Sequence, residues 1–274
     1  MNCRGKLLDL SSPGVMGILN ITPDSFFDGG KFTEEKQIKR QVKKMLDEGA
    51  DIIDVGAVST RPGAQAVSEK AELQRLIPVL KILIKKFPDT IFSVDTYRSD
   101  VARKAVEEGV AIINDISGGG FDKKMFATAG KLKVPYILMH IQGTPGTMQQ
   151  NPVYKDVVKE LLIFFQRKIV QVKDCGVHDI IIDPGFGFGK TVDHNFELLQ
   201  KLSLFKMLDY PLMAGISRKS MINKVLKTTP EKALNGTTVL NTIALMNGAN
   251  ILRVHDVKAA KEAVELFKKV NSRK

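Results

Sequence analysis

The chain of 274 residues has almost no cysteine and no long apolar run. Its 2 cysteines, Cys3 and Cys175, cannot build a disulfide framework, and neither lies in a spacing typical of metal ligands. No apolar run approaches the ~18 residues that a membrane-spanning helix needs, and the N-terminal segment lacks the basic and then apolar pattern of a signal peptide. These absences predict a soluble protein of the reducing cytoplasm, with no membrane partner.

An interdomain linker and a basic stripe are also missing. No Pro/Ser-rich segment divides the chain, so a single domain over residues 1–274 is expected, with residues 1–14 as a short N-terminal extension. Lysine and arginine exceed aspartate and glutamate by 41 − 30 = 11, but the lysines are scattered, as at Lys36, Lys39, Lys43 and Lys44. This pattern is typical of a solvated basic surface that suits small anions, and no nucleic-acid partner is expected.

The sequence does contain a regular alternation of apolar and amphipathic segments. Eight apolar runs are typical of buried parallel strands, and they span Val15–Ile21, Asp51–Val55, Ile91–Asp95, Ala111–Asp115, Tyr136–Met139, Asp179–Asp183, Leu212–Gly215 and Ile251–Val254. The segments between them carry apolar residues at helical spacing, such as Ile38, Val42 and Met45. Eight such units predict an α/β fold, a (β/α)₈ TIM barrel, and a doubly wound open sheet is the competing fold. Two helical patterns before the last run, Met221–Leu226 and Glu231–Met246, predict one extra helix.

The most informative stretch runs from Asp179 to Lys190. Its Ile-Ile-Ile run brings Asp183 to the end of a predicted strand, and glycines at 185, 187 and 189 allow a ligand to approach the backbone closely. A nucleotide-binding phosphate loop is disfavoured, because position 184, where that pattern needs its first glycine, is proline. A turn capped by Asp183 is the simpler alternative for this segment on its own.

Polar residues follow almost every apolar run, as a barrel with its site at the C-terminal ends of the strands requires. They are Asn20, the segment 59–63, Asp95, Asn114, Asp183, the segment 217–219, and Arg253 with His255. Each of them alone would be explained as a cap or a turn former. Their common position after successive strands instead predicts one shared site.

The motifs that carry these residues resemble those of the dihydropteroate synthase family. They are Asn20-Ile-Thr-Pro-Asp-Ser-Phe, Ser59-Thr-Arg-Pro-Gly, Ser93-Val-Asp-Thr, Asn114-Asp-Ile-Ser-Gly, Asp183-Pro-Gly-Phe-Gly-Phe-Gly-Lys, Gly215-Ile-Ser-Arg-Lys-Ser and Arg253-Val-His-Asp, in this order over nearly the whole chain. The resemblance implies a (β/α)₈ barrel, often dimeric, that joins 6-hydroxymethyl-7,8-dihydropterin diphosphate to p-aminobenzoate and releases diphosphate in folate synthesis. Two residues of the substrate loops depart from the family pattern, Val58 in place of Glu and Phe27 in place of the more usual Ser.

The resemblance implies a pterin pocket lined by Asp95, Asn114, Met139, Asp183, Gly215, Lys219 and Arg253. A 2-amino-4-oxo pyrimidine edge needs carboxylate acceptors and an amide that both donates and accepts, which Asp95, Asn114 and Asp183 supply. Lys219 is expected to donate to the acceptor side of the ring, and Arg253 to stack on its face. Met139 is expected either as an apolar wall of this pocket or as ordinary core.

The resemblance places p-aminobenzoate against Phe26, Thr60, Arg61, Pro62, Phe188 and Ser217. Ser217 begins a segment predicted to start a helix, whose free N–H groups suit a carboxylate. Catalysis is assigned to Asn20, Lys219, Arg253 and His255, with Mg²⁺ held by Asn20 and phosphate oxygens. Because the aromatic amine is uncharged near neutral pH, a dissociative displacement is predicted, in which diphosphate leaves before the amine captures the pterin methylene cation.

Two other functions stay open. A pterin-dependent methyltransferase barrel would share the pocket of Asp95, Asn114 and Asp183, but it would need no ligands for diphosphate. A catalytically silent pterin-binding paralogue is the alternative outside the enzymes, and the cationic residues at the strand ends disfavour it. The resemblance further implies that sulfonamides compete with p-aminobenzoate and that the chain forms a homodimer.

Overall fold

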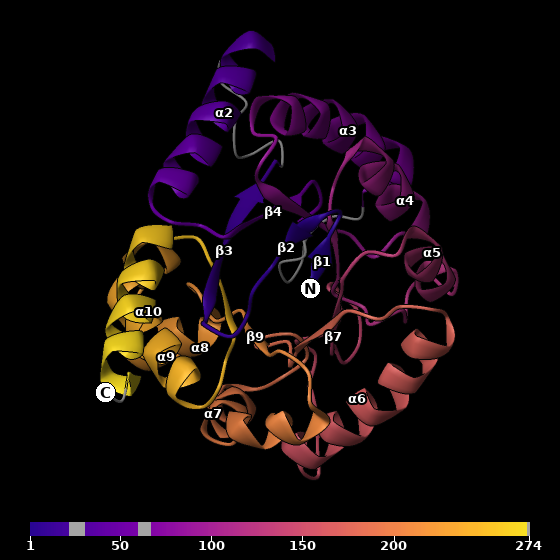
Figure 1. Ribbon diagram of the computed structural model, residues 1–274. Coiled ribbons are helices and arrows are strands. Elements are labelled where there is room, and N and C mark those ends of the chain that lie inside the picture. Colours follow the sequence, from indigo (N-terminus) through magenta and orange to yellow (C-terminus); the bar gives the residue numbers. More distant parts are fainter. Residues whose placement is uncertain (22–30, 60–66, 273–274) are drawn as a thin grey trace.

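Eight parallel strands form the centre of the computed structural model, which describes residues 1–21, 31–59 and 67–272. They are β3 (Gly14–Asn20), β4 (Ile52–Gly56), β5 (Ile91–Asp95), β6 (Ile112–Asp115), β7 (Tyr136–Met139), β8 (Ile180–Asp183), β9 (Met213–Ala214) and β10 (Ile251–Val254), in the order β8-β7-β6-β5-β4-β3-β10-β9. The outer two meet where Ile182 pairs with Leu212 and donates its N–H to the Pro211 carbonyl at 2.8 Å. The sheet is therefore a nearly closed barrel, so the predicted (β/α)₈ fold is confirmed and the open doubly wound sheet is wrong (Figure 1).

Helices follow the strands and form the outer ring of the barrel (Figure 1). They are α2 (Lys31–Asp47), α3 (Glu69–Lys86), α4 (Ser99–Glu108), α5 (Met125–Leu132), α6 (Val157–Asp174), α7 (Val192–Gln200), α8 (Ser220–Leu226), α9 (Leu234–Met246) and α10 (Val257–Asn271), with 3-10 turns η1 (Leu202–Leu208) and η2 (Pro230–Lys232). Local signals set several starts: Asp156 caps α6 by accepting the N–H of Lys159 at 2.9 Å, and Thr191 forms a capping box with His194 at α7. Within the described ranges, no helix is long and apolar enough to cross a membrane.

The strands lie within one residue of the predicted apolar runs at each end, and β5, β7 and β10 match at both ends. The runs are apolar because the outward faces pack against helices while the inward faces fill the barrel. The predicted extra helix is also present, since α8 and α9 both lie between β9 and β10.

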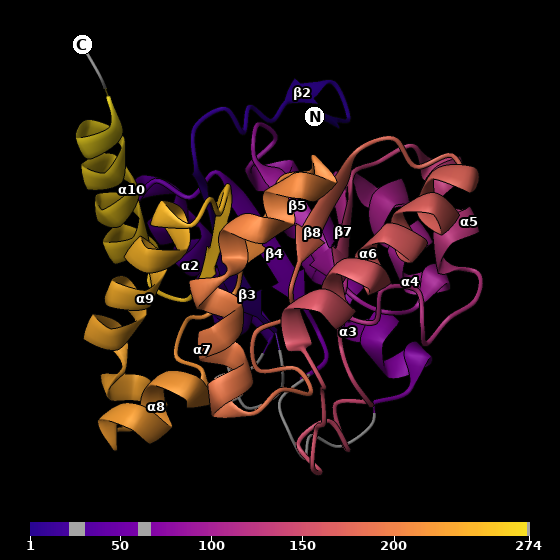
Figure 2. The same ribbon diagram turned by 90° about the horizontal axis from the view of Figure 1, so that it is seen from below.

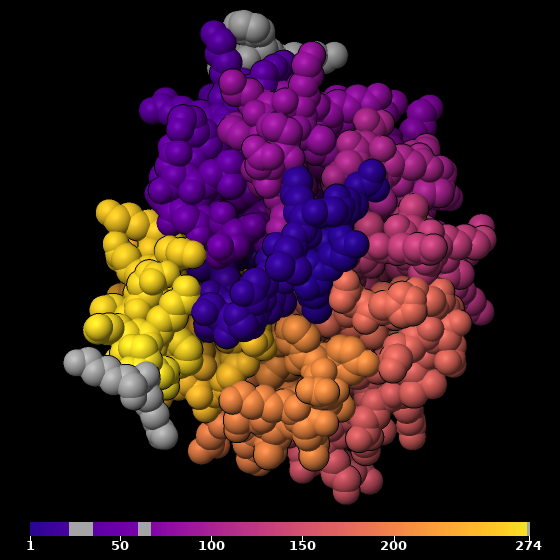
Figure 3. Space-filling model, in the orientation of Figure 1, coloured from indigo at the N-terminus to yellow at the C-terminus, as the bar shows by residue number. Residues whose placement is uncertain are grey.

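The N-terminal extension closes one end of the barrel. It forms a small antiparallel hairpin of β1 (Asn2–Cys3) and β2 (Lys6–Leu7), and the segment crosses the centre of the face shown in Figure 3. Its Cys3 and Leu8 pack on an apolar layer inside the barrel, made of Met16, Ile52, Ile91, Ile112, Ile137, Ile181, Met213 and Ile251. Because this end is covered, a site inside the barrel has to open at the opposite, C-terminal ends of the strands.

Candidate active site

The inward-facing residues of the strands change from apolar to polar along the barrel axis. Side chains alternate between inward and outward along a strand, so the residues two or four positions after the apolar layer also point inward. These residues are Asn20, Asp54, Ser93, Asp95, Asn114, Met139, Asp183, Gly215 and Arg253. They lie at or near the C-terminal ends of the strands, and Figure 2 shows the N-terminal hairpin at the opposite end of the barrel. All of the strand residues that the sequence predicted for the site are therefore brought together here.

Arg253 is held between two buried carboxylates. Its Nε donates to Asp54 Oδ2 at 2.7 Å, and its Nη2 donates to Asp95 Oδ2 at 2.6 Å. Burial by itself would lower the pKa of Arg253, but the two carboxylates outweigh burial and raise it. Burial raises the pKa of Asp95, and Arg253 opposes that shift. The guanidinium thus joins β10 to β4 and β5 in one ion-paired unit, a geometry that its rigid fork of donors favours.

Asn114 has its orientation fixed by the same unit. Its Nδ2 donates to Asp54 Oδ2 at 2.9 Å, and a carboxylate bound to Arg253 can only accept, so the amide oxygen has to face the other way. Asn114 Oδ1, Asp54 Oδ1 and Ser93 Oγ are buried and have no hydrogen-bond partner among the described residues. Buried polar atoms are nearly always satisfied, so these unpartnered atoms indicate a place where a bound ligand completes the bonding.

Asp183 and Lys219 bring a further carboxyl group and an amine into the site, close enough to influence each other's pKa. Asp183 Oδ1 accepts the N–H of Gly185 at 2.7 Å. Lys219 Nζ donates to the carbonyl of Phe186 and lies 4.5 Å from the centre of the Phe188 ring. Burial raises the pKa of Asp183, with Lys219 opposing, and burial lowers the pKa of Lys219 to about 8, with Asp183 opposing. The lysine therefore keeps its charge near neutral pH.

Gly215 leaves space between these charged groups. A Cβ at this position would lie 3.8 Å from Lys219 Nζ, 3.9 Å from Arg253 Cβ and 4.0 Å from Asp183 Oδ2. A larger side chain would occupy the centre of the site.

An apolar cluster forms one wall beside the charges. It contains Ile116, Met139, Met148 and Phe188, with Tyr97 and Ile141 packed against it. Met139 is thus buried in an apolar cluster beside the charged residues, and its role as a wall of the pterin pocket stays a prediction. A flat heteroaromatic ring has polar edges and apolar faces, and charged groups beside an apolar cluster suit such a ring.

The loops after β9 and β10 are tied together by two neighbouring contacts. Ser217 Oγ lies 3.0 Å from His255 Nδ1 and accepts the backbone N–H of His255 at 3.2 Å. Arg218 forms a two-pronged ion pair with Asp256, at 2.9 Å from Nε and 2.6 Å from Nη2. The positive φ of Arg218 (58°) turns the chain, so Ser217 and Lys219 flank a turn while Arg218 binds Asp256. The segment 217–220, which was predicted to start a helix, does so at its last residue, because α8 begins at Ser220 after the turn at Arg218.

Asn20 ends β3 beside Gly56, its neighbour in the sheet. A Cβ at Gly56 would lie 3.7 Å from Asn20 Oδ1 and 3.4 Å from Asp95 Cβ, so the missing side chain leaves the amide accessible. Among the described residues, no group of three or more His, Cys, Asp or Glu side chains could hold a metal ion by itself. A metal ion at Asn20 would therefore take most of its ligands from substrate oxygens and water, which is the usual arrangement for Mg²⁺.

Some of the predicted site lies outside the described residues. This applies to Phe26, Thr60, Arg61 and Pro62, and to the departure at Phe27. Conversely, Asp54 was not predicted from the sequence as a site residue. The sequence did contain an indication of it, because Asp54 is a carboxylate at an inward position of an otherwise apolar strand. A second omission was Lys190, which is buried beneath the loop after β8.

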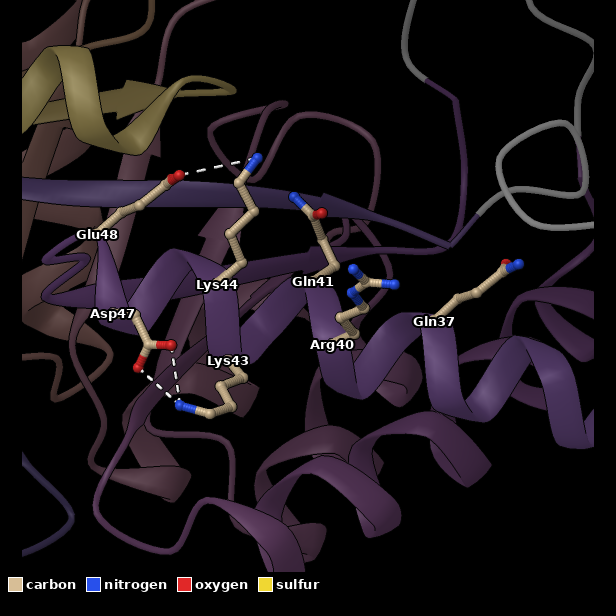
Figure 4. Close-up of a pocket in the computed structure, with 7 residues that line it drawn as sticks. All are labelled: Gln37, Arg40, Gln41, Lys43, Lys44, Asp47 and Glu48. Atoms are coloured by element: carbon tan, nitrogen blue, oxygen red, sulfur yellow. Dashed lines mark hydrogen bonds and ion pairs between the residues drawn. The ribbon is translucent and has the colours of Figure 1, made fainter.

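A depression on the surface of α2 is lined by exposed or partly exposed polar side chains and lacks the buried carboxyl groups and cations of the barrel end. It runs along α2 and is lined by Gln37, Arg40, Gln41, Lys43, Lys44, Asp47 and Glu48 (Figure 4). Its charges form ordinary helix pairs, with Lys43 at 2.8 Å from Asp47 and Lys44 at 3.7 Å from Glu48. Such exposed pairs are typical of a solvated helix face.

Comparison with known proteins gives concordant matches. The family described as pterin binding enzyme matches residues 16–255. The dihydropteroate synthase of Haemophilus influenzae is 45% identical over 266 residues, covering 96% of this chain and 96% of that protein. Among solved structures, the Yersinia pestis dihydropteroate synthase with a sulfonamide drug complex has a TM-score of 0.94 at 42% identity, covering 100% of this chain and 99% of the other. The Xanthomonas albilineans dihydropteroate synthase with 4-aminobenzoic acid has a TM-score of 0.92 at 38% identity, covering 99% and 98%.

Proposed function

The chain belongs to the pterin binding enzyme family, among the dihydropteroate synthases, and from this premise we propose how its site carries out the reaction. The enzyme is a transferase of folate biosynthesis that joins 6-hydroxymethyl-7,8-dihydropterin diphosphate to p-aminobenzoate. The products are 7,8-dihydropteroate and diphosphate.

The unpartnered acceptors of the barrel interior carry the proposal for the pterin pocket. The pyrimidine edge of a pterin presents a ring N–H and an exocyclic amine, and Asn114 Oδ1 and Asp54 Oδ1 are buried acceptors that lack a donor among the described residues. Asp183 adds a charged acceptor, and Lys219 donates to the oxygen side of the ring. Each hydrogen bond between the pterin and a charged group contributes ~1.5–3 kcal/mol to binding. A ligand without matching donors would leave these buried acceptors unsatisfied and would bind more weakly. Met139 and Phe188 supply the apolar wall.

The diphosphate lies toward Asn20 and His255 in this proposal. Nε and Nη2 of Arg253 already bind Asp54 and Asp95, so its main role is to hold those carboxylates in place and to contribute positive charge close to the leaving group. A Mg²⁺ ion fits here, because Asn20 offers a neutral oxygen ligand and this ion favours few protein ligands with phosphate oxygens and water. When bound, it neutralises charge on the departing diphosphate.

The displacement needs no strong base. The bond between the pterin methylene carbon and the diphosphate oxygen breaks, and its electron pair leaves with the oxygen. The uncharged amine of p-aminobenzoate then forms the new C–N bond with its lone pair and releases a proton to water. The side chains of the site have to orient the two substrates and stabilise the leaving charge, which is the part of catalysis that fixed charges perform best.

The p-aminobenzoate site is proposed next to Phe188 and Ser217, with Phe26, Thr60, Arg61 and Pro62 completing it. The Xanthomonas structure contains 4-aminobenzoic acid, and the Yersinia structure contains a sulfonamide drug complex. Sulfonamides carry a similar ring and amine, so they should compete with p-aminobenzoate here. The contact of Ser217 with His255 supports a site where the carboxylate of one substrate lies close to the diphosphate of the other.

We also propose a homodimer in a reducing cytoplasm. Cys3 and Cys175 are free, which fits that compartment. Helices α9 and α10 lie side by side (Figure 2). Met246 (60%), Leu266 (70%) and Val270 (77%) are exposed and line a groove between them. Apolar patches of this kind mark interfaces. Sedimentation velocity should show a dimer that dissociates in Met246→Glu with Leu266→Glu, whereas Val170→Glu, an equally exposed position on α6, should leave it intact.

The test of the reaction is a coupled assay for diphosphate release. Release should require both the pterin diphosphate and p-aminobenzoate, and it should stop when either is omitted. Pterin binding without release would instead show a catalytically silent paralogue. Turnover that needs a methyl donor and yields no diphosphate would show a methyltransferase.

A further inference from the structure

The loop after β8 has an unusual set of hydrogen bonds. Five consecutive backbone carbonyls, from Gly185 to Gly189, each accept a bond from a side chain. The donors are Lys190 to Gly185 at 3.0 Å, Lys219 to Phe186, Gln149 to Gly187 at 2.7 Å, Lys190 to Phe188 at 3.0 Å and Tyr154 to Gly189 at 2.7 Å. Backbone carbonyls need partners, and here side chains provide most of them in place of a helix or a strand, with one further bond from the Phe188 N–H to the Gly185 carbonyl at 3.1 Å. The conformation of the loop therefore depends on these donors.

The backbone of this loop is pressed against the segment that follows β7. Gly185 has φ +70°, and a Cβ there would lie 2.0 Å from the carbonyl oxygen of His140. Gly189 has φ +63°, and its Cβ would lie 2.3 Å from the carbonyl oxygen of Gln142. Only glycine fits at such positions, so the two loops pack backbone to backbone.

Lys190 lies at the centre of this contact and is almost fully buried, with 2% of its surface exposed. Besides the Gly185 and Phe188 carbonyls, its Nζ reaches His140 Nδ1 at 3.1 Å and the His140 carbonyl at 3.4 Å. Burial and then the charge of Lys190 together lower the pKa of His140 to about 2, so the ring is neutral and Nδ1 accepts. Four acceptors thus surround one amine that has three N–H donors when charged.

The groups that Lys190 fixes are the ones that face the substrates. The N–H of Gly185 binds Asp183 Oδ1, and the carbonyl of Phe186 binds Lys219. The ring of Phe188 lies against Lys219 Nζ. Lys190 forms no hydrogen bond with these three side chains among the described residues, so it positions them through the backbone of the loop, and its charge in addition lowers the pKa of Asp183.

We propose that Lys190 is a positioning residue for the reaction, which holds residues 185–189 so that Asp183, Lys219 and Phe188 meet the pterin and p-aminobenzoate in productive geometry. This inference rests on the proposed function. Displacement of reacting groups by about 1 Å can cost on the order of a hundredfold in rate, so loss of this anchor should weaken substrate binding and turnover together.

The experiment compares Lys190→Met, which keeps the length of the side chain and removes its N–H donors, with Lys201→Met. Lys201 is an exposed lysine at the end of α7 that pairs with Glu197 at 2.8 Å, so it is a matched control. Thermal unfolding, calorimetric affinity for the pterin substrate, KM for both substrates and kcat are measured on each. We expect Lys190→Met to raise the Kd and KM for the pterin diphosphate by about tenfold or more and to lower kcat. Lys201→Met should match the wild type.

A purely structural role predicts a different result. Lys190→Met would then lower the melting temperature and the active fraction, while the Kd and KM of the folded protein stayed at wild-type values, and that result would overturn the proposal. If Lys190→Met does not fold, Tyr154→Phe decides, because it removes only the donor to Gly189. A wild-type KM for the pterin diphosphate in Tyr154→Phe would likewise overturn the proposal. A rise in this KM, smaller than the one expected for Lys190→Met, would support the proposal. If the wild type binds pterin but releases no diphosphate, the proposed function fails while the Kd comparison still tests Lys190.

Discussion

Asp54 shows how much of the site depends on single atoms. Its Oδ2 accepts from Arg253 Nε at 2.7 Å and from Asn114 Nδ2 at 2.9 Å, and it is completely buried. Arg253 in turn reaches past β3 and β4 to bind Asp95 on β5. One carboxylate oxygen thus sets the orientation of a guanidinium and of an amide, and through them the position of a second carboxylate.

Replacement of Asp54 by Asn should damage both stability and pterin binding. The amide cannot offer a charged acceptor to Arg253, and it faces Asn114 or Arg253 with an N–H of its own. Loss of one partner of a buried pair costs about 3–5 kcal/mol, so urea denaturation should show a fall of that order in the free energy of unfolding. Asp89→Asn, at an exposed position, should change neither property. A stable Asp54→Asn variant with normal pterin affinity would contradict the role described for this carboxylate.

Asp183→Asn should separate binding from folding. The amide oxygen can still accept the N–H of Gly185, so the loop keeps its anchor and the melting temperature should change little. The other end of the side chain turns from a charged acceptor into a donor that faces the N–H groups of the pterin. Calorimetry should therefore show weaker pterin binding by ~1.5–3 kcal/mol, or roughly ten- to a hundredfold. Unchanged affinity in a folded variant would remove Asp183 from the site.

At the scale of elements, the N-terminal hairpin and the site occupy opposite ends of the barrel. Leu8 is 5% exposed and packs on the apolar layer, whereas its neighbour Leu7 is 81% exposed. Leu8→Ala should lower the free energy of unfolding by roughly 2–3 kcal/mol through the cavity that it leaves. Leu7→Ala should stay within about 0.5 kcal/mol of the wild type. Both variants should keep wild-type KM values, and a changed KM in Leu8→Ala would show that the two ends are coupled.

The elements themselves were predictable because each strand is a short apolar run between amphipathic segments. Once the strands were placed, their C-terminal ends gave most of the site. The contact between Arg253 and Asp54 was not predictable, because it joins β10 to β4 across an intervening strand and depends on barrel curvature. A one-dimensional pattern contains no information on which inward side chains meet across the interior.

Two local features could not be predicted in detail from the sequence. The segment from Ser217 leads into a helix, but Arg218 first adopts a left-handed conformation (φ 58°) and pairs with Asp256, so the helix begins at Ser220. A tertiary contact therefore sets where the helix starts. Lys190 resembled the lysine of a phosphate loop by its sequence neighbours, yet its amine points into the protein and binds backbone carbonyls. Burial, which the sequence does not specify for a single lysine, decides between these roles.

At the scale of the whole molecule, the charge of +11 is not concentrated in the barrel interior. The barrel interior places three carboxyl groups (Asp54, Asp95 and Asp183) beside Arg253, Lys219 and Lys190, whose pKa burial lowers to about 7, so no large excess of positive charge lies there. The excess belongs to the rest of the chain, where exposed lysines such as Lys43 and Lys44 lie. A positive exterior favours the approach of anionic substrates, while the mixed charges of the interior limit the electrostatic cost of burying so many ionisable groups.

The response of stability to pH should depend on His140. Burial and then Lys190 lower its pKa from the ordinary 6.5 to about 2 in the folded protein. Below pH 6.5 the unfolded chain therefore binds a proton on this imidazole that the folded protein does not bind. Protonation of this ring lowers the free energy of the unfolded state and not that of the folded state. The contribution of His140 to stability is therefore present above pH 6.5 and is lost as the pH falls. The slope is at most ~1.4 kcal/mol per pH unit.

Urea denaturation at pH 7.5 and pH 5 measures this effect. The wild type should lose about 2 kcal/mol more than His140→Asn over that interval, since asparagine cannot take up the proton and the carboxylates contribute equally to both proteins. His178→Asn is the matched control, because His178 is exposed and its ring meets water in the folded and unfolded chain alike. Its loss of stability should equal that of the wild type. Equal losses in His140→Asn and the wild type would mean that the ring takes up a proton without unfolding, which is incompatible with its bond to the Lys190 amine.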